Sequence, residues 1–288
     1  MIHVMSTPLP HRVPHRIPRH PHAWLVVLLA SQGAVALLWG SLGWRVGLPV
    51  MLATHALFWW GVMKPDSRMF GPVLSRLPTA EKVVWLTIDD GPSDDTPAML
   101  DLLDAAGARA TFFVVGDRAA ARPELVREMV RRGHTLGNHS RSHPQAWFWA
   151  LGPRRMRCEI EQTQAQLAGI TGSPPRWFRA VVGMANPFVH APLRDQSLTR
   201  VAWTARGFDA VAADPTAVVA RIERDLAPGA IILLHEGAKH GRNVEVLALL
   251  LQRLQALGYR TVLPELELEL ELELEPDRDR DPQPEPDL

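Results

Sequence analysis

The chain has 288 residues, enough for one large domain with additions at its ends. Its 31 basic and 31 acidic residues give a formal net charge of zero, so the charge balance does not favour a nucleic-acid partner. The single cysteine, Cys158, excludes an intrachain disulfide.

The N-terminal region predicts a membrane anchor. Residues 1–22 form a basic tail rich in Pro and His, and residues 23–44 carry no charge. At ~1.5 Å per helical residue this run reaches ~33 Å, enough to cross a hydrocarbon core. A second uncharged run covers residues 46–63, and Trp residues lie near the ends of both runs. We interpret residues 23–63 as two membrane-spanning segments joined near Gly43–Gly47; the alternatives are a cleaved signal peptide and a buried soluble hairpin.

Basic residues around the two runs predict how they are oriented. Three arginines precede the first run, one separates the runs, and three basic residues follow the second. The positive-inside rule then places both ends of the hairpin in the cytoplasm, and we expect the protein in the cytoplasmic (inner) membrane. The domain that follows could then reach lipid-linked or soluble precursor sugars. Pro49 and His55 weaken the second run, so the alternative is one span with a re-entrant segment and an extracytoplasmic domain.

The rest of the chain divides into three parts. Residues 64–78 are a basic linker, and residues 79–263 form the predicted catalytic domain. Residues 264–288 begin with Glu-Leu repeats and continue as an Asp/Arg/Pro/Glu tail. Such low complexity predicts a solvated appendage without a catalytic role, with a short edge strand at its start.

Within 79–263, apolar runs alternate with amphipathic ones, which predicts parallel strands joined by helices. Seven strands are expected, one fewer than in a full eight-fold barrel. They cover Val83–Ile88, Ala110–Val115, Thr135–Asn138, Trp177–Val182, Arg200–Trp203, Ala230–Leu234 and Tyr259–Leu263. The expected helices cover Thr96–Ala106, Glu124–Arg132, Arg154–Ala168, Pro187–Asp195, Pro215–Leu226 and Asn243–Leu257.

Charged residues follow four of these strands. Asp89 and Asp90 end the first, where α/β folds place their chemistry, and their mutual repulsion requires a cation or an arginine nearby. His139 and His143 follow the third; their spacing predicts one face of a helical turn and a shared cation. One Asp with two His would leave metal positions open for water and substrate.

Arg179 and His235 complete the set of charged residues at strand ends. Arg179 follows two aromatic residues and needs a carboxylate partner if it is buried. His235 follows a fully apolar strand, which suits acid–base work. The alternatives are a solvated arginine and an ordinary loop histidine.

Taken in order, these motifs resemble the polysaccharide deacetylase family, the NodB-homology domain of carbohydrate esterase family 4. The resemblance covers about residues 83–263. Two departures stand out: Ile88 replaces the usual Phe of the first motif, and Val181 replaces the proline of the third. The matching segments are Thr87–Gly91, His139–His143, Arg179–Gly183 and Leu233–His235, with Trp203 and Asp209 as candidates for the loosest, fourth motif.

The resemblance implies an α/β fold, a deformed (β/α)7 barrel, and metal-dependent removal of an N- or O-acetyl group from a saccharide. By this resemblance, one divalent ion is held by Asp90, His139 and His143. Zn²⁺ is the first expectation, and Co²⁺, Ni²⁺ and Mn²⁺ are the alternatives. The remaining roles are a base (Asp89), its orienting partner (Arg179), an oxyanion donor (the Val182 N–H), an acid (His235), and a substrate pocket (Leu233, Trp203 and Asp209).

Two other functions stay open at this point. One is a related amide or ester hydrolase acting on a non-sugar acyl group. The other is a weakly active, membrane-bound carbohydrate-binding protein on the same fold. The intact Asp-Asp pair, both His ligands and His235 argue against the second, because a scaffold does not need them.

Overall fold

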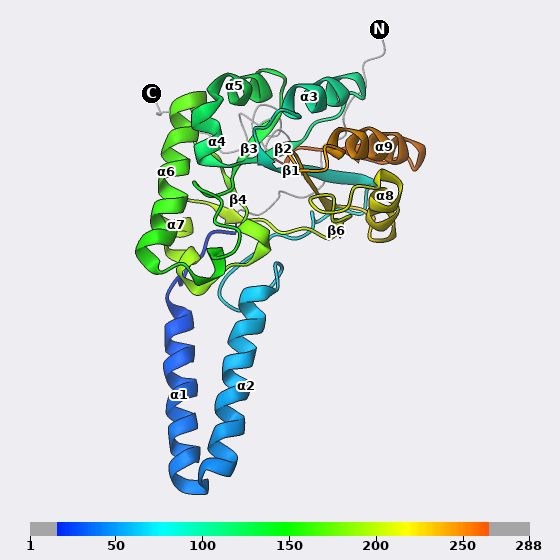
Figure 1. Ribbon diagram of the computed structural model, residues 1–288. Coiled ribbons are helices and arrows are strands. Elements are labelled where there is room, and N and C mark those ends of the chain that lie inside the picture. Colours follow the sequence, from blue (N-terminus) through cyan, green and yellow to red (C-terminus); the bar gives the residue numbers. More distant parts are fainter. Residues whose placement is uncertain (1–15, 265–288) are drawn as a thin grey trace, which may run out of the picture.

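The computed structural model describes residues 16–264 and shows a barrel standing on a helical hairpin (Figure 1). The hairpin consists of α1 (Ala23–Leu42) and α2 (Trp44–Met63), joined at Gly43, whose φ of 76° suits glycine. α2 continues through Pro49 without a break. The expected edge strand and acidic tail lie outside the described residues.

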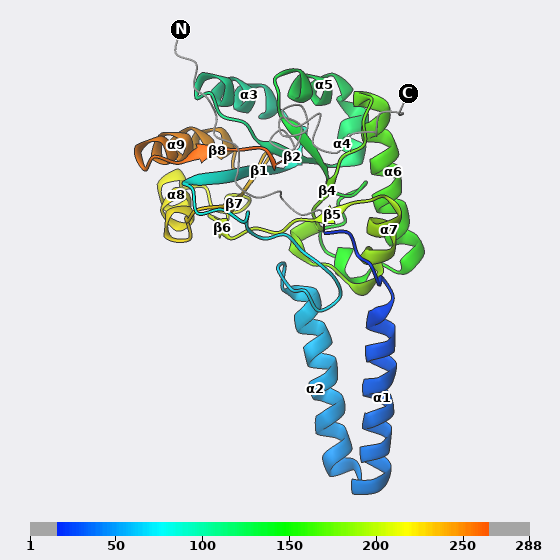
Figure 2. The ribbon, with the colours of Figure 1, turned by 180° about the vertical axis from the view of Figure 1, so that it is seen from behind.

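The hairpin is apolar on its outside. Within α1 only Val35 is buried, and both helices are long and apolar enough to be candidate membrane spans. Figure 2 shows both free ends of the hairpin turned toward the barrel and the turn between α1 and α2 at the far end. In water such a surface would be unfavourable, whereas in a bilayer it matches the lipid.

The barrel is built on one curled sheet whose strand ladders are all parallel. The strands follow the order β5-β4-β3-β2-β1-β7-β6, and β8 pairs with the start of β1. No ladder joins β5 to β6 within the described residues, so the barrel is open there. The strands are β1 (Val83–Gly91), β2 (Thr111–Val114), β3 (Thr135–Asn138), β4 (Trp177–Phe178), β5 (Thr199–Arg200), β6 (Ala205–Arg206), β7 (Ala230–His235) and β8 (Arg260–Thr261).

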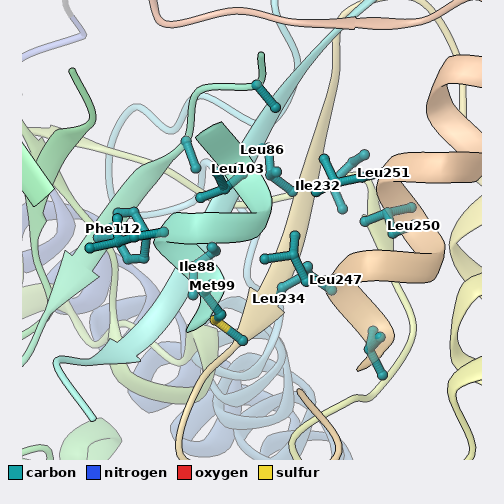
Figure 3. Packing of buried hydrophobic residues seen from close by; sticks show 14 of the residues in the cluster. Leu86, Ile88, Met99, Leu103, Phe112, Ile232, Leu234, Leu247, Leu250 and Leu251 are labelled. Atoms are coloured by element: carbon teal, nitrogen blue, oxygen red, sulfur yellow. The ribbon is translucent and has the colours of Figure 1, made fainter. Parts of the chain in front are cut away.

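Helices cover the outside of this sheet (Figure 1). Alternate β1 residues point to opposite faces: Leu86 and Ile88 meet the helices, while Trp85 packs inside the barrel with Phe113 and Trp177. Figure 3 shows the outer layer, in which leucines of α9 and α3 pack on β1 and β7. The helices are α3 (Thr96–Ala105), α4 (Gly116–Ala121), α5 (Pro123–Arg131), α6 (Pro153–Thr171), α7 (His190–Asp195), α8 (Pro215–Arg224) and α9 (Asn243–Ala256), with 3₁₀ turns η1 (Phe148–Ala150), η2 (Val181–Gly183) and η3 (Pro187–Val189).

The segment expected as a linker partly closes the gap in the barrel. Leu74 forms a bridge to Val201 and Arg76 one to Ala230, and Leu77 is buried in the inner core. This part of the segment therefore belongs to the barrel, because the apolar side chains of Leu74 and Leu77 pack in its inner core.

Several local predictions were wrong. The expected strands 177–182 and 200–203 are much shorter, because the chain turns at η2 and again before β6. The helix expected to end before Gly169 continues to Thr171, and Gly172, at φ 84°, ends it. His134, which precedes β3 and which we would expect on the surface, is 3% exposed, and its Nδ1 accepts a hydrogen bond from the Ala110 N–H.

Candidate active site

The site begins where β1 ends. Asp89 pairs in register with His235 of β7, and Asp90 follows with a positive φ of 71° that turns its side chain away from the regular strand direction. Gly91 leaves no room for a side chain, since a Cβ there would lie 2.0 Å from Glu236 Oε1. Buried Glu236 accepts hydrogen bonds from Ser93 and Thr96, which fixes the loop after Asp90.

Arg179 is fully buried and binds Asp89. Its Nη1 donates to Asp89 Oδ1 at 2.7 Å and to the Thr87 hydroxyl at 2.7 Å. The guanidinium carbon lies 4.1 Å from the Phe113 ring centroid. An ion pair this deep holds its carboxylate in one orientation, because loss of either partner would leave an unpaired buried charge.

Asp90, His139 and His143 converge on one point. One ligand atom from each lies within 4.8 Å of the other two. Asp90 Oδ1 is 3.4 Å from His139 Nε2 and 2.9 Å from His143 Nε2. Two imidazoles and one carboxylate are the donor set of catalytic zinc sites, so the trio fits a divalent ion.

Two further observations support that fit. Asp90 Oδ1 is buried without a well-formed hydrogen bond inside the described part of the chain. His139 places its Nδ1 2.9 Å from the Arg179 carbonyl, which turns Nε2 toward the trio, as in metal-bound histidines. Although burial raises the pKa of the Asp90 carboxyl, the two histidines lower it well below its usual range, so it stays ionised as a ligand must.

The loop that carries both histidines is not the helical turn that their spacing predicts. Ser140 and His143 have positive φ values of 66° and 50°. The loop is held by side chains instead: Asn138 accepts from the Ser140 N–H, and buried Glu159 accepts from the N–H groups of Arg141 and Ser142. These bonds bring the rings together, with centroids 5.1 Å apart.

His235, at the end of the neighbouring strand β7, has a carboxylate partner of its own. Its Nδ1 lies 2.9 Å from Asp209 Oδ1, and its backbone N–H donates to Asp209 Oδ2 at 2.6 Å. Burial lowers the pKa of His235, but attraction to Asp209, with smaller contributions from Asp89 and Asp90, raises it to about 9. The imidazole is therefore in its doubly protonated, charged form at neutral pH. Because Asp209 occupies Nδ1, Nε2 is left for the cavity.

The metal trio, Asp89 and His235 line one cavity of about 170 Å³. Leu233 and Trp203 line it as expected, whereas Asp209 does not; it is 1% exposed and lies behind His235. Gly183, the last residue of the third motif, lines it too. The sequence did not single out the other lining residues, because they follow short strands or lie in loops: Gln145, Arg206, Phe208, Ala210 and Val211.

Val182 also lines the cavity and has an unusual backbone. Its φ of 55° and ψ of 13° are left-handed, which is strained for a β-branched residue. No acceptor for its N–H is found among residues 16–264, so this donor is available to a ligand. Val181 starts a 3₁₀ turn rather than taking the β conformation allowed for the missing proline.

Comparison with known proteins matches residues 76–201 to the polysaccharide deacetylase family. A chitooligosaccharide deacetylase from Bradyrhizobium sp. (strain ANU 289) is 32% identical over 190 residues, which cover 61% of this chain and 86% of the relative. A peptidoglycan-N-acetylglucosamine deacetylase from Bacillus cereus is 30% identical over 206 residues, covering 70% and 95%.

Solved structures show the same fold. A family 4 carbohydrate esterase from Streptomyces lividans in complex with acetate superposes with a TM-score of 0.59 at 33% identity, over 65% of this chain and 96% of that one. A family 4 pseudoenzyme from Bacillus anthracis gives 0.60 at 25% identity, over 66% of each chain. The deformed barrel predicted from sequence is confirmed.

Proposed function

Because the chain belongs to the polysaccharide deacetylase family, we propose that it is a metal-dependent hydrolase that removes an acetyl group from an amino sugar of a saccharide. Its relatives are named as chitooligosaccharide and peptidoglycan N-acetylglucosamine deacetylases. One observation carries the proposal: a carboxylate–His–His trio shares one cavity with an arginine-held carboxylate and a carboxylate-held histidine.

In this proposal Asp90, His139 and His143 hold the divalent ion, Zn²⁺ first, with Co²⁺, Ni²⁺ and Mn²⁺ as alternatives. A bound ion would lower the pKa of a water ligand and polarise the acetyl carbonyl. A bound ion would keep coordination positions for water and substrate, because three donors converge here among residues 16–264.

The remaining residues move protons and stabilise charge. Asp89, held in place by Arg179, accepts the proton of the attacking water. The Val182 N–H donates to the oxygen that becomes negative, and His235 donates its proton to the leaving nitrogen. Leu233 supports the acetyl methyl inside the cavity.

Acetate release from chitooligosaccharides by the purified full-length protein, with and without added divalent metal, tests this function. We expect release that a chelator abolishes and Zn²⁺ restores. Metal binding without acetate release would favour a hydrolase for a non-sugar acyl group. Neither metal nor acetate would favour a carbohydrate-binding protein on the same fold.

We also propose that the hairpin anchors the protein in the cytoplasmic membrane, with residues 79–263 as the catalytic domain on the cytoplasmic side. Support comes from two apolar helices of 20 residues each, α2 running intact through Pro49. The three-one-three distribution of basic residues fits cytoplasmic ends.

A reporter fused after Leu263 tests this orientation. We expect fluorescence when the fused reporter is one that fluoresces only in the cytoplasm. An alkaline phosphatase fused at the same position should be inactive. A dark first fusion with an active second one would place the barrel outside instead.

A further inference from the structure

The cavity contains one arginine that the proposed mechanism does not use. Arg206 ends β6, and its guanidinium carbon lies 4.1 Å from the Phe208 ring centroid and 5.6 Å from that of Trp203. The side chain is thus held between two aromatic rings on the cavity wall. Its place is set by β6, whose Arg206 pairs in register with Leu233.

Arg206 has no partner for its charge inside the described range 16–264. No carboxylate lies within 4 Å of its guanidinium, and none of its N–H groups has a protein acceptor there. Other buried arginines differ: Arg179 binds Asp89, and Arg200 donates to the Ser67 carbonyl. The two rings offset part of the hydration that the half-buried guanidinium loses, but they accept no hydrogen bonds from its in-plane N–H groups. An anionic group of the ligand is the partner that fits this planar donor fork.

The cavity also lies beside the end of the hairpin. A Cβ on Gly183, a cavity residue, would lie 2.6 Å from the side chain of Pro65, two residues beyond α2. Trp59 of α2 packs edge-on against Trp149, at a centroid distance of 4.8 Å, on the segment that follows His143. The catalytic loops therefore rest on the hairpin ends that face the barrel (Figures 1 and 2).

The cavity mouth is apolar as well as close to this end. Val182, Phe208 and Val211 are 41%, 47% and 79% exposed although all three line the cavity. Clustered exposed apolar side chains at a binding site indicate an apolar ligand portion or a membrane. A ligand with a sugar in the cavity, an anion at Arg206 and a lipid chain over the mouth would account for all three observations. These are the unpaired guanidinium, the nearby hairpin end and the apolar mouth.

We propose that Arg206 binds the phosphate of a lipid-linked amino sugar, so that the site deacetylates a saccharide anchored in the bilayer. This inference rests on the proposed function in taking the cavity as the sugar site. The aromatic rings of Trp203 and Phe208 fix the guanidinium, and its N–H groups bind phosphate oxygens in pairs. The lipid remains in the membrane that holds the hairpin.

Binding separates this inference from the proposed activity. The full-length protein with Asp89→Asn, in lipid nanodiscs, is titrated with N-acetylglucosamine 1-diphosphate and with neutral di-N-acetylchitobiose. We expect Arg206→Gln to raise the Kd for the diphosphate sugar about tenfold or more, with Arg206→Lys intermediate, and to leave the Kd for the neutral sugar unchanged. Arg224→Gln, an exposed arginine in the last turn of α8, is the matched control.

Unchanged diphosphate binding in Arg206→Gln, or equal weakening of both ligands, would overturn the anion site. The lipid is tested with wild-type protein and the same diphosphate sugar carrying an isoprenoid chain in the nanodisc. We expect a higher kcat/KM for the lipid-linked form, and an equal or lower value would refute the membrane substrate. Absence of acetate release from every substrate would contradict the proposed function, while the binding result would still decide the role of Arg206.

Discussion

The two walls of the cavity hold their charges in different ways. On one wall, Asp89, Asp90, His139 and His143 form a continuous network with Arg179, held by loops with positive φ angles. On the other, His235 lies on an apolar and aromatic surface and binds Asp209 behind it, where Asp209 also accepts a hydrogen bond from Asn243. The first wall has the donors for a metal and a base, and the second has a proton donor with room for substrate.

This difference predicts how substitutions will behave. On the metal wall each charge has several partners, so one change disturbs the whole network. On the acid wall Asp209 is no part of the metal trio and acts through His235, so a change there should mainly move the pKa of His235.

His139→Ala should have the largest effect. It removes one of three ligands and leaves Asp90 Oδ1 buried with one imidazole fewer. We expect loss of the divalent ion by elemental analysis and a fall in acetate release beyond the ~10²–10⁴-fold typical of losing one acid or base. His134→Ala, a buried histidine outside the trio, is the control for ordinary destabilisation. Full metal retention in His139→Ala would refute the ligand assignment.

Asp89→Asn should keep the metal but lower kcat by ~10²–10⁴-fold, because it removes a base and no ligand. Elemental analysis and acetate release on the same preparation check both statements. Turnover at the wild-type rate would exclude Asp89 as the base.

Asp209→Asn should shift the pH profile. The proton donor must be protonated to act, so with a pKa of about 9 for His235 the wild-type rate should fall above about pH 9. Without Asp209, burial would dominate, and the pKa should move toward or below the ordinary 6.5. We therefore expect the alkaline limb of the kcat profile to move to lower pH. His235→Ala should lack this limb, and an unmoved limb in Asp209→Asn would contradict the pairing.

Val181→Pro should have the smallest effect. Val181 has helical backbone angles, and Ala180 before it is extended at ψ 140°, the conformation that precedes proline. A compatible proline stabilises a fold by ~0.4–1 kcal/mol through the unfolded chain. We expect an equal or slightly higher Tm in thermal unfolding, with acetate release unchanged or improved. A marked fall in Tm would show that the N–H of residue 181 is needed.

The long, strongly patterned elements were predictable. β1, β2 and β7 follow apolar runs, and α9 follows leucines at helical spacing. β4, β5 and β6 have two residues each, too few for a periodic pattern. α4 has six residues and begins with glycine, so its helical signal is weak.

In the site, residue types were easier to predict than their surroundings. The motif segments identified Asp90, His139 and His143, and the structure brings these three together. The loop conformation at Ser140 and the place of Asp209 behind His235 depend on contacts from distant segments, such as Glu159 of α6 and Asn243 of α9. Arg206 carries no motif, and only its place on the short β6 brings it into the cavity.

Arg179 joins the two functions of the metal wall, with a consequence for evolution. Its side chain holds Asp89, and its carbonyl orients His139. Replacing Arg179 alone would leave a buried Asp89 charge unpaired, and replacing Asp89 alone would do the same to Arg179. Such pairs show strong epistasis, since the second substitution costs far less than the first. A lineage that lost either partner would cross a deep fitness valley, so the two residues are expected to be kept or lost together.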